Sequence, residues 1–217
     1  MVCCTRYCAA ETHFDRKVAE RDLRRYRRRG PDATTRFMLA ELRRWPLEGR
    51  KLLDVGGGIG VISAELAGAD VAGVTVVEAS PAYLEVAQRE VGPRYESRPT
   101  KFILGDFALI AATLPDADVV RLDRVVCCYP DSEALLRRAA DRARQLLAFT
   151  YPLDRWYVRT IIALENFWLW LTGNTLRAFV HSPERMGAVL EAAGLVRATR
   201  REAFLWTLDL YRRGDAN

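Results

Sequence analysis

Several residue types are scarce in this chain of 217 residues, and each scarcity excludes a class of protein. The five cysteines are an odd number, and four of them form the adjacent pairs Cys3-Cys4 and Cys127-Cys128, which is a poor basis for a disulfide framework. Uncharged stretches such as residues 55–64 and 167–176 reach about half of the roughly 20 apolar residues that a membrane span needs. The N-terminus lacks the apolar region of a signal peptide. We therefore expect neither a secreted disulfide scaffold nor a membrane span, and we expect a cytoplasmic protein.

Lysine is also rare, since only Lys17, Lys51 and Lys101 are present and the other 30 of the 33 basic residues are arginines. The net charge of +5 and the isoelectric point near 9.1 are therefore carried by arginine, a bias more typical of coding composition than of nucleic-acid binding. Half of the residues are hydrophobic and 28% are charged, so the chain can bury a core. Its length fits one domain.

The hydrophobic pattern changes period along the chain. Helical spacing predicts helices over residues 13–29 and 33–45, ahead of strands and helices that alternate from residue 51 onwards. Strands are predicted at residues 51–55, 72–78, 100–104, 118–123, 145–151, 196–204 and 205–212. Alternation of this kind predicts a single α/β domain over 1–217 with a doubly wound, mostly parallel sheet of seven strands.

Four segments of that domain have different predicted roles. Residues 1–45 form an N-terminal helical cap, and residues 46–152 form the core that would bind a cofactor. Residues 153–181 are an aromatic helical insertion on the acceptor side, and residues 182–217 supply the last helix and a closing β-hairpin.

The most informative motif is a glycine cluster between the first strand and the helix after it. Ligands of such sheets bind at the carboxyl ends of the strands, so this loop is a candidate cofactor site. A Walker A loop is excluded because no Gly-Lys-Ser/Thr follows. The Gly-x-Gly-x-x-Gly fingerprint fails too, since its third glycine would fall on Val61 or its second on Ile59.

The residues do spell Asp54-x-Gly56-x-Gly58-x-Gly60, which resembles motif I of the class I S-adenosylmethionine-dependent methyltransferases. Glu78 ends the second strand, where a carboxylate can accept both hydroxyls of a ribose. Asp106 follows the third strand, where the family places an acid near the adenine amino group. The resemblance implies S-adenosylmethionine as the cofactor, held by Tyr26, Asp54, Gly56, Gly57, Gly58, Gly60, Glu78, Ala79, Gly105, Asp106, Phe107 and Arg124.

The methyl acceptor should bind between the end of the fourth strand and the insertion. The Asp/Asn-Pro-Pro-Tyr motif of enzymes that methylate bases or glutamine is absent. The rings of the insertion are too numerous for one stripe of a helix, so they either build core or face a pocket, a partner or a membrane surface. We predict a small, flat or apolar acceptor that contacts Cys127, Cys128, Tyr129, Trp156, Asn166, Trp170 and Arg177.

Two residues are candidates for proton transfer, His181 and Asp123 at the end of the fourth strand. Alignment of the acceptor with the methyl group is the alternative, and it needs no base. The segment Leu-Asp-Arg…Tyr-Pro and the later Arg-x-Phe-x-His are loosely similar to magnesium-protoporphyrin O-methyltransferases, although Cys128 replaces the histidine that this family has before Tyr-Pro.

Two other functions stay open. An RNA methyltransferase could use the basic run Arg24, Arg25, Arg27, Arg28 and Arg29 to follow a phosphate backbone, although a solvated helix face is the plainer interpretation. A non-catalytic module could bind S-adenosylmethionine without transferring the methyl group. The oligomeric state and the pathway are not predicted.

The cysteines raise a further hypothesis. Cys3, Cys4 and Cys8 lie on an N-terminal arm that could fold over the edge of the sheet where Cys127 and Cys128 are expected. Thiolates grouped there could hold a soft metal or metalloid, or act in redox chemistry. The spacing is not that of a zinc site, and the alternative is that Cys127 and Cys128 pack as small apolar residues. No resident metal is predicted.

Overall fold

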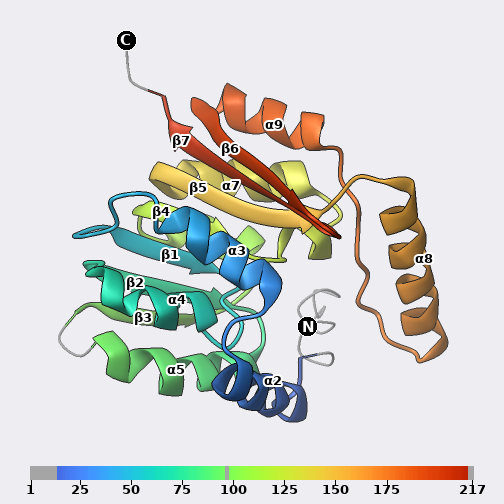
Figure 1. Cartoon of the computed structure of the whole chain (residues 1–217), viewed down its shortest axis with the longest axis horizontal. Helices are drawn as coiled ribbons and strands as arrows, with labels where there is room; N and C mark the ends of the chain where they lie inside the picture. Colours follow the sequence, from blue (N-terminus) through green and yellow to red (C-terminus); the bar gives the residue numbers. More distant parts are fainter. Residues whose placement is uncertain (1–13, 96–97, 215–217) are drawn as a thin grey trace.

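The computed structural model describes residues 14–95 and 98–214, and a sheet of seven strands forms its centre (Figure 1). The strands are β1 (Lys51–Val55), β2 (Gly73–Glu78), β3 (Thr100–Leu104), β4 (Ala117–Leu122), β5 (Ala143–Pro152), β6 (Leu195–Ala203) and β7 (Trp206–Arg213). They lie in the order β3-β2-β1-β4-β5-β7-β6, and β7 runs antiparallel to both of its neighbours. The prediction of a doubly wound, mostly parallel sheet is confirmed.

Helices cover both faces of the sheet. One face is covered by α3 (Ala33–Leu42), α4 (Val61–Leu66) with the short 3₁₀ turn η1 (Ala67–Ala69), and α5 (Pro81–Tyr95). The other face is covered by α6 (Phe107–Ile110), η2 (Ala111–Thr113), η3 (Val126–Cys128), α7 (Ser132–Arg142) and α9 (Pro183–Ala192). The first described helix, α2 (Arg16–Arg29), packs against α5 beyond the edge of these layers.

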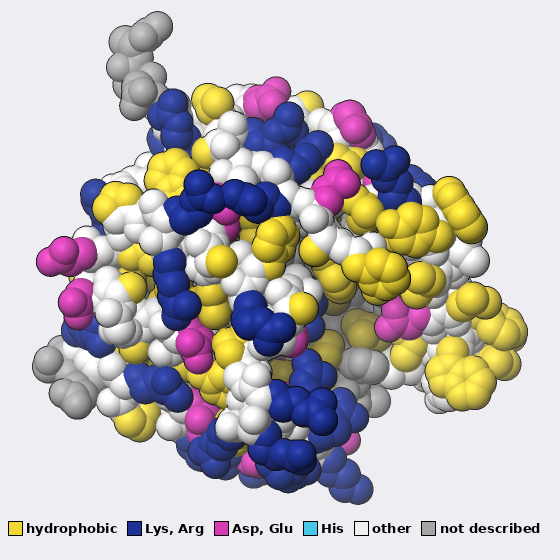
Figure 2. Space-filling view, viewed as in Figure 1, with side chains coloured by type: hydrophobic (Ala, Val, Ile, Leu, Met, Phe, Trp, Pro, Cys, Tyr) yellow, Lys and Arg dark blue, Asp and Glu magenta, His cyan; other side chains and the backbone are white. Residues whose placement is uncertain are grey.

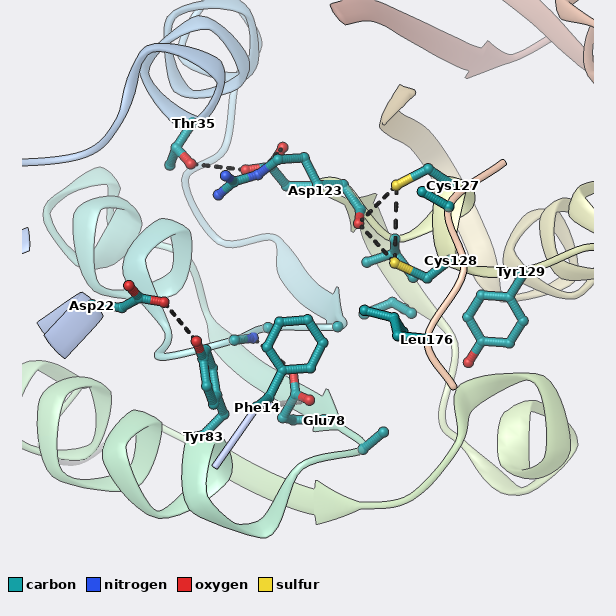
Figure 3. A pocket seen from close by; sticks show the side chains of 18 of the residues that line it. Phe14, Asp22, Thr35, Glu78, Tyr83, Asp123, Cys127, Cys128, Tyr129 and Leu176 are labelled. Carbon is teal, nitrogen blue, oxygen red and sulfur yellow. Dashed lines mark hydrogen bonds and ion pairs between the residues drawn. The ribbon is translucent and has the colours of Figure 1, made fainter. Parts of the chain in front are cut away.

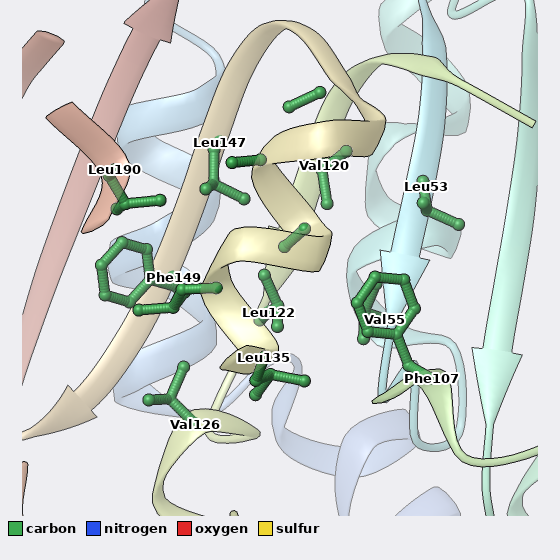
Figure 4. Packing of buried hydrophobic residues seen from close by; sticks show 14 of the residues in the cluster. Leu53, Val55, Phe107, Val120, Leu122, Val126, Leu135, Leu147, Phe149 and Leu190 are labelled. Carbon is green, nitrogen blue, oxygen red and sulfur yellow. The ribbon is translucent and has the colours of Figure 1, made fainter. Parts of the chain in front are cut away.

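Alternate side chains of the central strands supply two separate cores, as expected for a parallel sheet buried on both sides. Leu53, Val120 and Leu147 point to the side of α7, where Leu135 and Phe149 join them (Figure 4). Their sequence neighbours in the strands point to the side of α3, α4 and α5. Two buried faces explain why these strands are apolar runs without alternation.

One helix extends beyond its predicted end. The spacing predicted that the helix after Ser80 would stop at Glu90, but α5 continues to Tyr95 and contains Pro93. Val91 and Tyr95 are buried on the same side of this helix, and the Tyr95 hydroxyl donates to the carbonyl of Ser63 at 2.8 Å. The burial of these two side chains outweighs the local preference of proline against helix.

The aromatic insertion forms the helix α8 (Trp156–Leu171), which stands apart from the sheet (Figure 1). Trp156, Trp168 and Trp170 are 79%, 66% and 63% exposed, so the interpretation that these rings build core is wrong. Figure 2 shows hydrophobic side chains gathered on the surface of α8, and the exposed hydrophobic residues of this helix include these three tryptophans. Within the described part of the chain, none of the helices combines the length and the apolarity that crossing a bilayer requires.

Candidate active site

A cavity of about 760 Å³ opens at the carboxyl ends of the parallel strands, between α2 and α8 (Figure 3). Its walls come from the loops after β1, β2, β3 and β4, from the inner face of α8, and from the segment 175–179. This volume lies in the range of small-molecule sites. Ligands of open α/β sheets bind at this edge, where the strand order reverses.

The glycine loop forms the floor of the cavity. Gly56 has φ of 61°, and a Cβ atom there would lie 2.3 Å from Val125 Cγ2, so a side chain is excluded on two grounds. Gly57 and Gly58 line the cavity with backbone only. Gly60 begins α4 and does not line the cavity, since a Cβ there would contact Val91 of α5 at 2.5 Å. Gly60 is therefore required by the packing of α4 against α5.

Asp54 lies behind this loop and does not line the cavity. Its carboxylate is fully buried, forms an ion pair with Arg121 of β4, and accepts a hydrogen bond from the hydroxyl of Ser63. The Arg121 side chain is buried as well. Asp54 therefore links β1 to β4 and α4 behind the glycine loop, and a cofactor in the cavity would not contact it directly.

Glu78 lies at the end of β2, in the wall of the cavity. One carboxylate oxygen accepts from the backbone N–H of Gly58 at 2.8 Å, and the other accepts from Ser80 at 2.9 Å. Burial raises the pKa of Glu78 above its usual value, although these N–H donors act in the opposite direction. Each oxygen keeps a further lone pair for a ligand hydroxyl.

The carboxylate of Glu78 also indicates which ligand the loop can accept. Gly58 N–H is the kind of backbone donor that a phosphate-binding loop presents to its ligand, and here it is taken by a carboxylate. A phosphate beside that carboxylate would be repelled, whereas the two hydroxyl donors of a ribose would be bound. The residues present therefore fit the ribose of S-adenosylmethionine.

A second acid lies on the adjacent wall. Asp106 caps α6 by accepting from the Ala108 N–H at 2.9 Å, and it also accepts the hydroxyl of Tyr129. The side chain of Phe107 is buried beside it, while Gly105, Asp106, Phe107 and Ala79 all line the cavity. This wall offers an acid and an apolar ring for a flat heterocycle, which fits an adenine.

The N-terminal helix closes the cavity on the cofactor side. The hydroxyl of Tyr26 donates to Glu65 at 2.8 Å, and burial together with this bond raises the pKa of Tyr26 to about 12. Tyr83 packs edge-on against Phe14 with ring centroids 5.3 Å apart, and its hydroxyl donates to Asp22 at 2.6 Å. Of these residues, the sequence predicts only Tyr26, because contacts between α2 and α5 have no local signature.

Asp123 and Arg124 hold the loop after β4 in place. The Asp123 carboxylate accepts from the hydroxyls of Thr35 and Thr150 at 2.8 and 2.7 Å. Arg124 has a positive φ of 58°, its N–H donates to the Thr150 hydroxyl, and its guanidinium pairs with Asp32 at 2.9 Å. Both residues line the cavity. Thr35, Asp32 and Thr150 were missed by the sequence analysis, because their role depends on the packing of α3 against the sheet.

On the acceptor side, the structure brings only part of the predicted set together. Cys127, Cys128, Tyr129 and Arg177 line the cavity, whereas Trp156, Asn166 and Trp170 do not. The two tryptophans point to solvent. The apolar wall is instead made by residues that the sequence did not single out, and these include Val158, Ile161, Ile162, Leu169, Leu176 and Phe179.

Asn166 links α8 to the chain segment that returns from it. Its side-chain amide donates to the carbonyl of Ala178 at 2.8 Å, and its carbonyl accepts from the Ala178 N–H at 2.8 Å. This reciprocal pair replaces the strand partner that the returning segment lacks. Asn166 therefore fixes the position of the cavity wall and does not itself touch an occupant.

His181 lies behind the wall, against the turn that carries the cysteines. Its Nε2 atom is buried without a hydrogen-bond partner, and it is not among the residues that line the cavity. Burial lowers the pKa of His181, so the imidazole is neutral near pH 7. The geometry does not bring His181 to the position expected of a base.

Together the fold and the site define a methyltransferase of the S-adenosylmethionine-dependent class. The chain belongs to the methyltransferase domain family, whose model matches residues 23–198. No curated protein sequence matches the chain. The cofactor predicted from the glycine motif is therefore confirmed at the level of the family.

Solved structures share the fold at low sequence identity. Magnesium protoporphyrin IX methyltransferase from Synechocystis PCC 6803, with bound S-adenosylhomocysteine, aligns with a TM-score of 0.68 and 19% identity over 83% of this chain and 82% of that one. A TehB-like methyltransferase from Corynebacterium glutamicum aligns at 0.63 and 14% over 92% and 98%. An O-methyltransferase family protein from Burkholderia thailandensis aligns at 0.66 and 18% over 84% and 57%.

Proposed function

We propose that the protein transfers a methyl group from S-adenosylmethionine to a small, apolar or flat acceptor. The observation that carries this proposal is the continuity of the cavity, which extends from Glu78 and the glycine loop to the inner face of α8, where Glu165 lies among aliphatic side chains. One end offers hydroxyl acceptors and the other offers aliphatic side chains. A polar cofactor and an apolar acceptor would therefore lie end to end in one continuous cavity.

The chain's own residues have separable tasks in this reaction. Glu78 would hold the ribose hydroxyls, Asp106 would face the adenine amino group, and Phe107 would pack on the ring. When bound, the cofactor supplies an electrophilic methyl group on a sulfonium. Tyr26 and Phe14 would restrict water on that side of the cavity.

The acceptor would be placed by the wall formed by α8 and the segment 175–179. Of the two candidate bases, Asp123 is the one that reaches the cavity, but both of its oxygens already accept hydroxyl hydrogen bonds. We therefore infer that the rate depends on alignment of the acceptor with the methyl group, because holding two reactants in the reactive geometry can remove about 7–11 kcal/mol of the barrier. Asp123 would contribute by keeping β4 and α3 together.

The test is the affinity of Glu78→Ala for S-adenosylmethionine, measured by isothermal titration calorimetry. Loss of two charge-assisted hydrogen bonds should weaken binding by about 3 kcal/mol, or roughly a hundredfold. Glu191→Ala is the matched control, because Glu191 is exposed on α9 and should leave the affinity unchanged. Unchanged affinity in a folded Glu78→Ala variant would refute the assignment of Glu78.

RNA is the second candidate acceptor, favoured by a shallow hollow on α2 that is lined by arginines. These are Arg21, Arg24, Arg25, Arg27, Arg28 and Arg29. Three of them already pair with acids, through the contacts Arg21–Asp22, Arg25–Asp32 and Arg27–Glu90. The test is RNA binding by the unmodified chain and by a variant in which Arg24, Arg28 and Arg29 are changed to glutamine. Micromolar binding that falls steeply with salt and is lost in the variant would favour RNA over a small molecule as the acceptor.

A further inference from the structure

Two thiols lie side by side in the acceptor half of the cavity. Cys127 and Cys128 belong to η3, directly after β4, and both line the cavity. Their sulfur atoms are 3.9 Å apart, and both lie near the backbone carbonyl of Arg124, at 3.4 and 3.7 Å (Figure 3). The fold therefore turns two successive side chains to the same side, and the function proposed above does not use their chemistry.

A disulfide is a poor product for this pair. Adjacent Cα atoms are about 3.8 Å apart, which is shorter than the 4.4–6.8 Å that disulfides ordinarily span, so a direct bond would be strained and easily reduced. A single atom held between the sulfurs removes that difficulty. Two bonds of about 2.3 Å, the length of a typical metal–thiolate bond, would separate the sulfurs by about 3.5–3.8 Å at angles of roughly 100–110°.

The donor count decides which atom can bridge. Zinc needs four ligands, and within residues 14–95 and 98–214 no group of three or more histidine, cysteine or acidic side chains could hold a metal ion. A soft centre that is satisfied by two sulfurs is required, because thiolates select soft partners. Trivalent arsenic with one organic substituent meets this condition, since it carries one carbon and needs two sulfurs.

We propose that Cys127 and Cys128 form a chelating dithiol site for a trivalent organoarsenical. Both As–O bonds of R–As(OH)₂ break and two As–S bonds form, and the two thiol protons leave with the hydroxides as two molecules of water. No oxidant or reductant takes part. The apolar wall of α8, with Ile162 and Leu169, offers a place for the organic substituent. Binding does not depend on methyl transfer.

The ionisation of the pair supports this chemistry. The hydrogen bond between the two sulfurs, in which either atom can be the donor, couples their ionisation, so that the pKa of Cys127 is raised and that of Cys128 is lowered. Cys128 is also the less buried of the two. Cys128 is therefore the thiolate that attacks arsenic first, and Cys127 closes the ring.

The experiment uses phenylarsine oxide as the probe and the full chain with Cys3, Cys4 and Cys8 changed to serine, since these three lie outside the described residues. We expect one phenylarsenic group per chain by native mass spectrometry and the loss of both thiols to a thiol reagent. A dithiol such as 1,2-ethanedithiol should reverse binding, and glutathione should not. Cys127→Ser and Cys128→Ser should each weaken binding at least about a hundredfold, because two linked contacts bind about 10²–10⁴ times tighter than one.

A comparison with the unfolded chain tests whether the fold contributes to the affinity for phenylarsine oxide. The same protein in urea should bind phenylarsine oxide at least about tenfold more weakly, because only the native turn holds both sulfurs on one side. Equal affinity for the folded and unfolded chains would overturn the proposal. So would native binding that survives either serine substitution, or no native binding in a chain whose circular dichroism is unchanged.

Discussion

Asp54 is buried directly behind the glycine loop, where a Cβ atom added at Gly57 would lie 3.3 Å from its carboxylate. Its carboxylate and the guanidinium of Arg121 form an ion pair from which water is excluded, with Ser63 as an additional donor. An ion pair in this setting contributes little net stability, but removing one partner strands the other charge in the core. The loss of unfolding free energy therefore depends on whether a mutation removes one partner of the Asp54–Arg121 pair or both.

We expect Arg121→Met to lower the free energy of unfolding by about 3–5 kcal/mol, because it leaves the Asp54 carboxylate buried without its cation. Urea unfolding followed by circular dichroism measures this change. Arg137→Met is the control, since Arg137 is exposed on α7 and should change stability by less than about 0.5 kcal/mol. The double variant Asp54→Asn/Arg121→Met should recover part of the loss, and a further drop would contradict the argument.

At the scale of elements, the position of α8 depends on a small number of contacts. The helix stands apart from the sheet and returns through the segment 174–181, which the side chain of Asn166 holds by two hydrogen bonds. The Cys127 carbonyl accepts from the Phe179 N–H at 2.8 Å and ties the same segment to η3. These contacts set the width of the acceptor half of the cavity.

Asn166→Ala should loosen this returning segment and leave the cofactor half unchanged. Hydrogen exchange at the amide of Ala178 should accelerate by about tenfold, which corresponds to the roughly 1–1.5 kcal/mol of a lost hydrogen bond. Exchange in β1 and β2 should stay as it is. Thr160→Ala, on the exposed side of α8, is the control that should not alter exchange at Ala178. Unchanged exchange at Ala178 in Asn166→Ala would show that Asn166 does not position the wall.

The elements themselves were largely predictable from the sequence. The strand Thr100–Leu104 and the helix Trp156–Leu171 have the predicted bounds, because each is a clear apolar run between turn residues. The end of α5 could not be predicted, since Gly92 and Pro93 signal a stop and only the burial of Tyr95 overrides it. The solvent exposure of Trp168 could not be predicted either, because an aromatic-rich helix has the same sequence pattern whether it is buried or exposed.

Site residues that directly follow strands could be predicted from the sequence. Site residues that reach the cavity through tertiary packing could not. Glu78 and Asp106 follow successive strands, so the sequence places both at one edge of the sheet. Tyr83 and Thr35 reach that edge from helices, and nothing in their neighbours in the sequence indicates it. His181 was expected beside the acceptor for its chemistry alone, and the structure places it behind the wall.

At the scale of the whole molecule, His181 links global stability to pH. Burial lowers its pKa in the folded state below the ordinary 6.5, so the unfolded chain binds the proton first as the pH falls. The stability contributed by the neutral side chain is complete above about pH 6.5 and is lost as the pH falls through the folded-state pKa. His181→Gln should therefore show a shallower loss of unfolding free energy between pH 7 and pH 5 than the unmodified chain, measured by urea unfolding. Equal pH slopes for His181→Gln and the unmodified chain would refute the linkage.

The contact between Gly56 and Val125 has a consequence for how this protein can be recombined. The turn that receives the cofactor and the turn that carries the thiols meet where no further atom fits, with 2.3 Å between Val125 Cγ2 and any Cβ at Gly56. Any loop graft at this edge of the sheet must therefore keep glycine at position 56 for as long as valine stands at position 125.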